Sequence, residues 1–482
     1  MADPQKARKY IEKESPYLVS TKSKLDEIGC GMCLAKWTQV TVHLQNGHTH
    51  SCHHPKTHKV SLTEIKRNPS ALHNTRYKKM RRKEMLVDNK RPDECTYCWN
   101  VEDNSDRYSD RTFKSGESWS LPHYDEIKNS SWRDDFNPRY VEVAFSNACN
   151  FKCSYCGPAF SSTWMEEIDK HGGYPTTTDG GGGFNNLAGL TNEDKMPIPH
   201  REYNPYVEAF WKWWPDLYED LHTFRITGGE PLLTKDTFKV LDYIIEHPNP
   251  NKNLSLAINS NLGVPKEIID KFLEKMKVLE QEDKVKEIII FTSVDTWGKQ
   301  AEYIRHGLDF NYFWDNCHRV LEVLKRVNLT YMSTYNALSV PNYGKLIDGI
   351  YKLKEQYGSS DRYWNSATFL DTSYLRYPQH QTVQVLPKIW SDEIFKQAQQ
   401  LDFLALPIFE SMYIGYSDIE VQKIKRIYDW MISVDRDKES FNINRSDFGR
   451  FFQEHDKRRG TNFVEVFPEY ESFYRKCLEI KL

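Results

Sequence analysis

The chain has 482 residues, and its 65 Lys and Arg residues nearly balance its 68 Asp and Glu residues, for a formal net charge of −3. This balance creates no overall field that would favour nucleic acid or a membrane surface as a partner. No stretch reaches the ~18 apolar residues of a membrane span, and the N-terminus lacks the apolar core of a secretion signal. We therefore expect a cytoplasmic protein of two or three domains, without a membrane or nucleic-acid partner.

Cysteines are concentrated in the first third of the chain, where eight of the ten lie before residue 157 in short spacings. In a chain without a secretion signal, this clustering favours metal or cluster ligation in a reducing compartment over disulfides. The ten are Cys30, Cys33, Cys52, Cys95, Cys98, Cys149, Cys153, Cys156, Cys317 and Cys477.

The first cysteines flank a predicted β-hairpin. A strand-like stretch at 37–44 is followed by the turn signal Asn46-Gly47 and by a second short strand. The hairpin brings Cys33 and Cys52 to the same end of the two strands.

A Cys-x2-Cys pair closes this segment after a helix expected at 68–88. Together the hairpin and the pair supply four thiolates, Cys33, Cys52, Cys95 and Cys98. Four thiolates can hold either zinc or an iron–sulfur cluster, and the residues alone leave both open.

Two further groups lie in the same segment. Cys30 is left over once four thiolates complete a site; it can substitute as a ligand, but we expect a free thiol. Five histidines are expected to be solvated side chains of the hairpin, with His53 or His54 hydrogen-bonded near the cysteines. The five are His48, His50, His53, His54 and His58.

A second cysteine group follows a polar stretch at 104–135, which we expect to be a linker. Cys149, Cys153 and Cys156 come directly after a strand-like run at 140–145, with the spacing C-x3-C-x2-C. In α/β barrels, the loops at this end of the strands build the active site. Three thiolates can hold three irons of a four-iron cluster and leave the fourth open, while zinc is the alternative.

Strands and helices then alternate. Helices are expected at 161–170, 236–246 and 310–326, and strands at 140–145, 223–226, 254–258, 287–292 and 329–335, with a sixth near 365–370 or 381–386. This alternation predicts an α/β fold, a partial and open (β/α)6 barrel with a parallel sheet.

The end of the chain changes to helical patterns, with helices expected at 394–403, 421–434 and 467–480. A glycine-rich insertion at 172–183 is expected to form a loop over the substrate. We therefore expect three parts: a cysteine-rich module with its linker at 1–135, the barrel at 136–387 and a helical cap at 388–482.

Small polar residues follow the predicted strands. The second barrel strand runs into Gly228, Gly229 and Glu230, where the glycines allow close backbone approach to a ligand and the carboxylate can accept from an ammonium group. The third and fourth strands end at the mouth of such a barrel, where a ribose or a carboxylate can be held. The residues there are Asn259, Ser293 and Asp295.

The run Cys149-Asn150-Phe151-Lys152-Cys153-Ser154-Tyr155-Cys156 resembles the signature of the radical SAM superfamily. The resemblance implies a four-iron cluster whose open iron binds S-adenosylmethionine (SAM), which is then reductively cleaved to a 5′-deoxyadenosyl radical. The Gly-Gly-Glu-Pro run resembles the second motif of that family, which receives the SAM amino group, and Arg305 matches an arginine that pairs the methionine carboxylate. The cofactor-binding candidates are Tyr155, Gly228, Gly229, Glu230, Asn259, Ser293, Asp295 and Arg305.

The earlier cysteines, in the pattern Cys33, Gly47-x4-Cys52 and Cys95-x2-Cys98, resemble the SPASM/twitch auxiliary-cluster module of that superfamily. The resemblance implies one auxiliary four-iron cluster as an electron relay, of the shorter twitch type. The module precedes the barrel here, whereas the family more often places it afterwards. The resemblance also implies a peptide or protein substrate and an external electron donor of the flavodoxin or ferredoxin type.

We predict a radical SAM enzyme that abstracts hydrogen from a peptide or protein residue, for maturation, crosslinking, epimerisation or oxidation. Two alternatives stay open: radical modification of a small molecule, sugar or nucleotide, and a zinc-stapled binding protein with an inactive barrel. Cys477 and Cys317 are candidate hydrogen donors, since radical SAM epimerases use a single cysteine in this way. The helical spacing of Cys317 with Val320 and Leu321 also fits a core position.

Overall fold

The computed structural model describes residues 15–177, 196–199, 201–362, 364–405, 414–434 and 439–481. Gly180–Gly183 of the predicted glycine-rich loop lie outside these ranges. The chain divides into two compact units. Unit 1 comprises 1–145, 198–226 and 251–256, and unit 2 comprises 146–197, 227–250 and 257–482.

Unit 1 contains the predicted hairpin. The strands β1 (Gln39–His43), β2 (His48–His50) and β3 (His58–Lys59) pair antiparallel in that order. Gly47 in the β1–β2 turn has a φ of +68°, a left-handed conformation that glycine adopts without strain. The predicted hairpin and its Asn-Gly turn are therefore confirmed.

The hairpin extends a parallel strand pair. β1 pairs in parallel with β4 (Tyr140–Ala144) along the whole length of both strands. The strand order in this unit is β6-β4-β1-β2-β3, where β6 is Thr223–Thr227. The aromatic face of α10 (Pro205–Asp220) packs beside these strands, with the Phe210 ring 5.1 Å from that of Phe145.

The helices of unit 1 surround a core of their own. They are α2 (Pro16–Ile28), α3 (Ala35–Thr38), α4 (Leu62–Arg67), α5 (Arg76–Leu86), α6 (Thr96–Asn104), α7 (Asp110–Gly116), α8 (Tyr124–Asn129) and α10. Leu25, Trp37, Trp99 and Ile127 from four of these helices are at most 6% exposed in one apolar cluster. Burial of such side chains contributes roughly 1.5–3 kcal/mol each and holds the short helices together.

Two element boundaries in unit 1 differ from the prediction. The first strand starts after Thr38, whose hydroxyl donates to the carbonyl of Leu34 at 3.0 Å and holds residues 35–38 in a helical turn. The helix expected at 68–88 is interrupted, since Thr75 caps α5 by accepting from the N–H of Lys78. A separate 3-10 turn, Pro69–Leu72, precedes this cap.

The predicted linker at 104–135 is wrong. This stretch folds into α7 and α8, and Tyr124 and Ile127 of α8 are buried in the core of unit 1. The stretch looks like a linker by composition because its few apolar residues are spread among many charged ones. Short helices nevertheless place those apolar residues on one face.

Unit 2 contains the remaining strands. They are β5 (Lys152–Cys153), β7 (Ser255–Ser260, whose first two residues belong to unit 1), β8 (Glu287–Ser293), β9 (Arg305–His306), β10 (Val327–Tyr335) and β11 (Thr368–Tyr374). The order is β11-β10-β8-β7, with β10 parallel to both β8 and β11. The sixth strand, β11, overlaps the predicted stretch at 365–370, while the alternative at 381–386 forms 3-10 turns.

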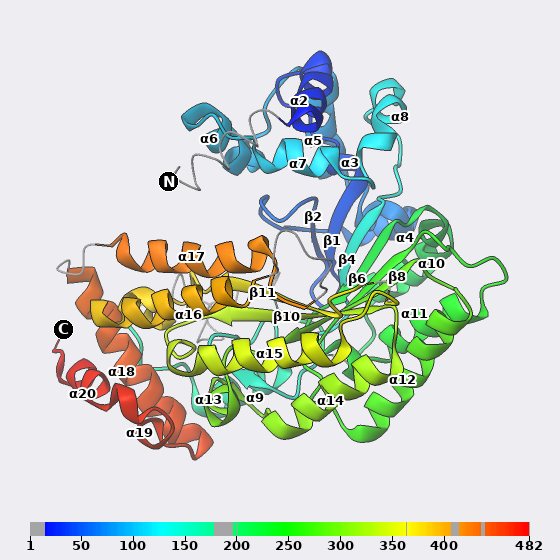
Figure 1. The fold of residues 1–482 in the computed structure, drawn as a ribbon. Coiled ribbons are helices and arrows are strands. Elements are labelled where there is room, and N and C mark those ends of the chain that lie inside the picture. The colour runs from blue at the N-terminus through cyan, green and yellow to red at the C-terminus, as the bar shows by residue number, and fades with distance from the viewer. Residues whose placement is uncertain are drawn as a thin grey trace. The chain divides into compact units, whose positions relative to one another are not determined.

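Helices separate these strands in the sequence. They are α9 (Ser162–His171), α11 (Lys235–Glu246), α12 (Lys266–Gln281), α13 (Gly298–Ile304), α14 (Phe310–Val323) and α15 (Tyr343–Tyr357). Figure 1 shows α12, α14 and α15 following one another along one side of the strands. A mixed α/β fold with parallel strands is therefore confirmed, and the partial (β/α)6 barrel stays a prediction.

The end of unit 2 is helical, as predicted. Its helices are α16 (Ser391–Phe403), α17 (Asp418–Ile432), α18 (Glu439–Arg459), α19 (Phe463–Val466) and α20 (Glu471–Glu479). The sequence prediction missed α18, although its fully buried Phe448, Phe451, Phe452 and His455 have the spacing of one helix face. Within the described ranges, no helix combines the length and apolar character needed to cross a membrane.

Candidate functional site

The loop that carries the C-x3-C-x2-C motif is fixed by backbone pairing. β5 pairs antiparallel with β9, which places Cys153 opposite Arg305. The N–H of Ser154 donates to the carbonyl of Ile304 at 2.7 Å and continues this pairing. The loop therefore has a defined backbone between its second and third cysteines, in direct contact with the segment that carries the predicted arginine.

The three thiols of this loop influence one another. Burial, followed by the neighbouring Cys153, raises the pKa of Cys149 and raises that of Cys156 to about 12. The Phe151 N–H donates to the sulfur of Cys149 at 3.4 Å, and a guanidinium N–H of Arg305 donates to that of Cys153 at 3.6 Å. Such thiols keep their protons until a metal or cluster replaces them, and the donor set is the soft sulfur that iron–sulfur clusters take.

Glycines let neighbouring segments pack against this loop. A Cβ on Gly229 would lie 2.3 Å from the carbonyl oxygen of Ala148, and a Cβ on Gly307 would lie 2.8 Å from that of Asn150. The N–H groups of Gly229 and Glu230 donate to the carbonyls of Ser146 and Ala148. Gly228 adopts a φ of +118° beside them. The predicted Gly-Gly pair therefore lies close to the cysteine loop, and its backbone groups hold that loop.

Glu230 is buried and accepts three hydrogen bonds. Its carboxylate accepts from the N–H of Leu232 at 3.0 Å, from the hydroxyl of Ser260 at 2.8 Å and from the N–H of Asn261 at 2.6 Å. Burial nevertheless raises the pKa of Glu230 to about 7, because desolvation of the carboxylate outweighs these three donors. The side chain predicted to receive an ammonium group thus joins the Gly-Gly turn to the end of β7.

Three predicted residues form one buried network. Arg305 lies 2.8 Å from Asp295 through Nε and donates to its other oxygen through Nη2 at 3.0 Å. The Tyr155 hydroxyl accepts from Arg305 at 2.5 Å and donates to Asp295 at 2.8 Å. Asp295 is fully buried and also accepts from the N–H of Thr334 at 2.9 Å. The guanidinium of Arg305, which was predicted to bind the carboxylate of a ligand, therefore binds the carboxylate of Asp295 in the chain itself.

The remaining two candidates lie on neighbouring strands near this network. Asn259 is the fifth residue of β7, and its amide nitrogen lies 3.7 Å from the sulfur of Met332. Ser293 ends β8 and is in register with Met332 of β10. Both side chains are half-buried. The structure therefore brings these two residues to one region of the parallel strands.

Sequence reasoning missed two residues that hold the cysteine loop. Gln381 is buried, accepts from the hydroxyl of Ser154 at 2.8 Å and donates to its carbonyl at 3.0 Å. Arg459 of α18 donates to the carbonyl of Lys152 at 2.6 Å and pairs with the buried Glu167 at 3.1 Å. Both lie more than 200 residues from the motif in the sequence, so no local sequence pattern identifies them.

The four cysteines of unit 1 line one cavity. Cys33 precedes α3, Cys52 follows β2, and Cys95 and Cys98 lie at the start of α6. The cavity wall also contains Lys36, Ser51, His54, Trp99 and Arg111. Burial and then the charges of the other three cysteines raise the pKa of Cys33 to about 12, which shows that all four thiols are close together.

The segment predicted to be a linker supplies hydrogen-bond donors to these sulfurs. The Arg111 N–H donates to Cys98 and offsets part of the burial that raises its pKa to about 11. The nearby Ser109 hydroxyl donates to Glu102 at 2.5 Å. The Ser115 hydroxyl lies 3.9 Å from the sulfur of Cys33. Donors of this kind stabilise a thiolate and orient it toward a metal.

Within the described ranges, no three His, Cys, Asp or Glu side chains are arranged to hold one metal ion.

Four further residues that the sequence analysis considered are Cys30, His54, Cys317 and Cys477. Cys30 is exposed, and its N–H donates to the side chain of Asn89 at 2.8 Å. His54 lines the cavity and pairs with Asp110 at 2.7 Å. Cys317 in α14 and Cys477 in α20 are both buried.

The prediction of solvated histidines is wrong for two of the five. His48 and His50 are 7% and 9% exposed. Burial lowers the pKa of His50 to about 4, so its imidazole is neutral at pH 7. The alternation of β2 places both side chains against neighbouring residues rather than in water.

Comparison with known proteins gives a limited match. No protein-family model matches the chain. Over 206 residues the chain is 23% identical to a GTP 3′,8-cyclase of Sulfurimonas denitrificans, and the alignment covers 42% of this chain and 49% of that protein. The chain thus spans about half the length of the curated relative. This similarity supports the radical SAM superfamily as a coarse classification.

Among solved structures, a crystal structure of Streptococcus suis SuiB bound to S-adenosylmethionine aligns with 72% of this chain and 75% of that one. The sequence identity is 13% and the TM-score is 0.29. A score this low does not establish a common fold. The SPASM/twitch subgroup therefore stays a prediction.

Proposed function

We propose that this chain is a radical SAM enzyme that abstracts hydrogen from a peptide or protein residue. The observation that carries the proposal is the loop of Cys149, Cys153 and Cys156, which is held by β9 and by the Gly-Gly turn. Its three thiols leave one vertex of a four-iron cluster without a protein ligand. The similarity to a GTP 3′,8-cyclase supports the same class of chemistry.

The residues of this loop fit a cluster by their chemistry. Three soft thiols lie in one eight-residue run, and each has its pKa raised by burial. When bound, the cluster with SAM supplies reductive cleavage of SAM to the 5′-deoxyadenosyl radical, which removes hydrogen from the substrate.

The surrounding residues position and seal this site. Arg305 places a positive charge beside the sulfur of Cys153, which favours the thiolate over the thiol. Tyr155 and Asp295 fix the guanidinium and keep its charge paired. Gly229 allows the turn before Glu230 to approach the loop, where its backbone N–H groups and carbonyls are positioned near the cysteines. Asn259 and Ser293 offer polar groups for a ribose or carboxylate.

The four cysteines of unit 1 are proposed to hold an auxiliary four-iron cluster that relays an electron. With four thiolates, the cluster has a protein ligand on every iron, so electron transfer suits it better than substrate binding. An external donor of the flavodoxin or ferredoxin type would supply electrons, and a reducing, cytoplasmic setting suits free thiols. The parts 1–135, 136–387 and 388–482 would then serve as auxiliary module, barrel and cap.

A second candidate function is modification of a nucleotide or another small molecule. Its specific support is the relative whose name gives GTP as the molecule acted on. A zinc-stapled binding protein with an inactive barrel is the third. Iron and zinc analysis of protein purified without oxygen separates it from the first two.

The test of the proposal is formation of 5′-deoxyadenosine. Protein reconstituted with iron and sulfide without oxygen is reduced with dithionite in the presence of SAM, and the nucleoside is quantified by chromatography. Formation that depends on reductant and on Cys153 supports the proposal. Iron-loaded protein that produces none contradicts it. Addition of candidate peptides or of GTP then shows which one increases the yield and separates the two substrate classes.

A further inference from the structure

Lys36 lies beside the four cysteines of unit 1, between Cys33 and the start of β1. Its side chain is only 2% exposed and lines the cavity together with Cys95 and the other three cysteines. Glu94 forms an ion pair with Lys36 and also accepts from the hydroxyl of Tyr77 at 2.9 Å. The ammonium is therefore fixed in place, with one carboxylate on one side and the sulfur of Cys95 on another.

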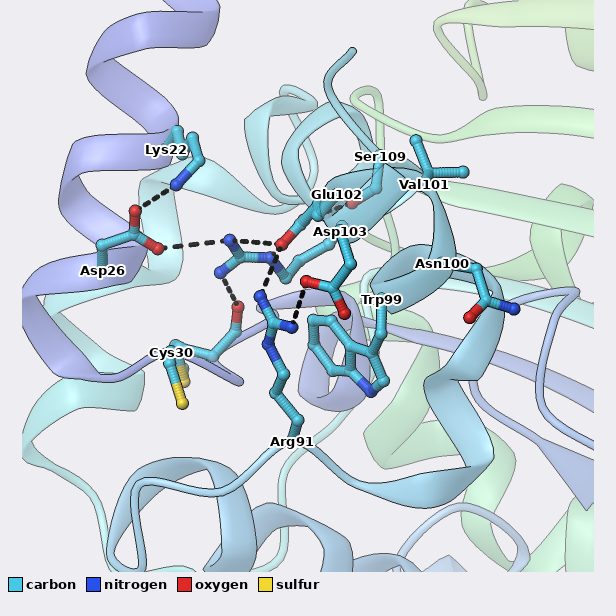
Figure 2. A network of polar contacts seen from close by, with 12 residues as sticks. Lys22, Asp26, Cys30, Arg91, Trp99, Asn100, Val101, Glu102, Asp103 and Ser109 are labelled. Atoms are coloured by element: carbon cyan, nitrogen blue, oxygen red, sulfur yellow. Dashed lines mark hydrogen bonds and ion pairs between the residues drawn. The ribbon is translucent and has the colours of Figure 1, made fainter. Parts of the chain in front are cut away.

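Arg111 and Lys114 are further cations of the cavity wall, and Arg111 is charge-compensated. Arg111 forms ion pairs with Glu102 at 2.9 Å and with Asp26 at 3.2 Å. Figure 2 shows that the same carboxylates also serve other cations, since Lys22 pairs with Asp26 and Arg91 with Glu102 and Asp103. Arg111 is thus one member of a network in which carboxylates and cations balance. Near Cys98, Arg111 contributes its backbone N–H more than a net positive charge.

The Lys36 side of the cavity is different, because two further buried basic side chains, Lys78 and Arg82, lie near it. Lys78 donates to the hydroxyl of Thr49 at 2.9 Å and to the carbonyl of His50 at 3.2 Å. Arg82 donates to the side chains of His73 at 2.7 Å and Asn74 at 2.8 Å. These partners are neutral. Burial lowers the pKa of Lys78 well below its ordinary value, whereas it lowers the pKa of Arg82 only to about 9, so Lys36 and Arg82 are the charged groups on this side at pH 7.

Electrostatics within the cavity agrees with this geometry. Burial alone disfavours the Lys36 ammonium, but the charges of Cys95 and Glu94 outweigh it and raise the pKa of Lys36. The Lys36 ammonium in turn favours the thiolate form of two sulfurs, because its charge offsets part of the effect by which burial raises the pKa of Cys95 and of Cys33. Lys36 thus acts on at least two of the four ligands.

A fixed buried cation has a predictable effect on an iron–sulfur centre. One-electron reduction makes the centre more negative by one charge. A positive charge within a few ångströms in a low-dielectric interior stabilises that reduced state. Net local charge and hydrogen bonds to the ligand sulfurs are the main means by which a protein sets the reduction potential of such a cluster.

We propose that Lys36 sets the reduction potential of the four-cysteine centre, and that its ammonium, held by Glu94 against Cys95, makes this centre the better electron acceptor. The proposal rests on the proposed function in one respect, namely that the four cysteines hold an iron–sulfur cluster. Lys36 acts through Cys95 and is a positioning residue. The step is a one-electron reduction of the centre, in which no bond is formed or broken.

The test isolates this centre from the other one. Full-length protein with C149A, C153A and C156A retains only the unit 1 cysteines as a cluster site. It is reconstituted without oxygen, and its midpoint potential is measured by a redox titration followed by electron paramagnetic resonance. Lys36→Met is expected to shift the potential to a more negative value. Lys36→Arg is expected to keep it near that of the parent, and Glu94→Gln to shift it to a more positive value.

Lys83→Met is the matched control, since Lys83 is a half-exposed lysine of α5 that pairs with Asp88 at 2.6 Å. Its potential is expected to equal that of the parent. Equal potentials for Lys36→Met and the parent at equal iron content would overturn the proposal. If Lys36→Met fails to assemble a cluster, Glu94→Gln decides, and an unchanged or more negative value would overturn the proposal.

Zinc in place of iron at this site would also overturn it. Formation of 5′-deoxyadenosine by the wild-type protein reports the radical SAM function separately, so failure of the Lys36 proposal and failure of the proposed function are distinguishable.

Discussion

The two cysteine groups differ in how the chain assembles them. In unit 2, Cys149, Cys153 and Cys156 come from one loop of eight residues, and the backbone of that loop is held by distant segments. In unit 1, four cysteines come from three separate segments and meet at one cavity. The first group is local in sequence and needs support, whereas the second group exists only once the unit has folded.

The surroundings of the two groups differ as well. In unit 2 the nearby cation, Arg305, has its charge paired by the fully buried Asp295. In unit 1 Lys36 pairs with the single carboxylate of Glu94, and the buried Lys78 and Arg82 near it donate to neutral partners. Three ligands with a paired cation suit a centre that must bind a cofactor at its open vertex. Four ligands in a positive environment suit a centre that accepts an electron.

The largest expected effect separates the two groups by function. Cys153→Ala is expected to reduce the 5′-deoxyadenosine yield below detection, because two thiolates do not hold the SAM-binding cluster. Cys95→Ala is expected to leave uncoupled SAM cleavage, because it affects only the other group. The measurement is nucleoside yield per reconstituted protein. Loss of SAM cleavage in a folded, SAM-binding Cys95→Ala protein would show that the two groups do not act separately.

The next effect is on stability and concerns the paired cation. Asp295→Asn leaves the Arg305 guanidinium buried without its carboxylate, which is expected to cost about 3–5 kcal/mol of the free energy of unfolding. Urea denaturation measures this loss. Lys299→Ala, which breaks the exposed pair with Glu302, is the control and is expected to leave the free energy of unfolding close to that of the parent. Equal losses in both variants would contradict the buried network.

A third effect is a pH dependence that unit 2 owes to Glu230. Burial raises the pKa of this group to about 7 in the folded protein, above its ordinary value of 4.5. The stabilising contribution of its neutral form is therefore complete below 4.5 and is lost as the pH rises through 7. Relative to Glu230→Gln, the free energy of unfolding should fall by roughly 3 kcal/mol over this interval.

Denaturation of both proteins across that pH range checks the sign as well as the size. If the wild type instead becomes more stable relative to Glu230→Gln as the pH rises, the three hydrogen bonds to the Glu230 carboxylate outweigh the cost of its burial.

The smallest expected effect concerns Cys30, three residues before Cys33, a proposed ligand in unit 1. Its thiol is exposed and lies near the carbonyl of Asn89 rather than at the cavity. Cys30→Ala is therefore expected to leave the iron content unchanged, whereas Cys33→Ala is expected to lose the iron of one cluster. Elemental analysis of iron in the two variants, measured in parallel, tests this expectation. A loss of iron in Cys30→Ala would place this thiol among the ligands.

The two groups also show how far sequence reasoning reaches. Patterns of a few residues predict the strands that precede Cys149 and Glu230. They also predict the Asn-Gly hairpin that brings Cys33 and Cys52 together. Such patterns express local conformational preference. The helix α18 was missed, although its buried face has helical spacing, because its polar residues dominate the composition.

Contacts between distant parts of the chain could not be predicted in this way. Arg459 reaches the carbonyl of Lys152 from 307 residues away, and no local preference encodes that pairing. The pairing of Arg305 with Asp295 likewise depends on the packing of β9 beside the cysteine loop. The stretch at 104–135 was predicted to be a linker for a related reason. Its role, donation from the Arg111 N–H to Cys98, appears only when unit 1 is folded.

The central claim is that Cys149, Cys153 and Cys156 hold a cluster with one vertex open to SAM. Its most direct test is electron paramagnetic resonance of the dithionite-reduced C95A/C98A variant, in which these three cysteines form the remaining cluster site, recorded with and without SAM. We predict a paramagnetic signal whose g values change when SAM is added. A reduced, iron-loaded protein whose spectrum does not respond to SAM, or a protein without any such signal, would contradict the account.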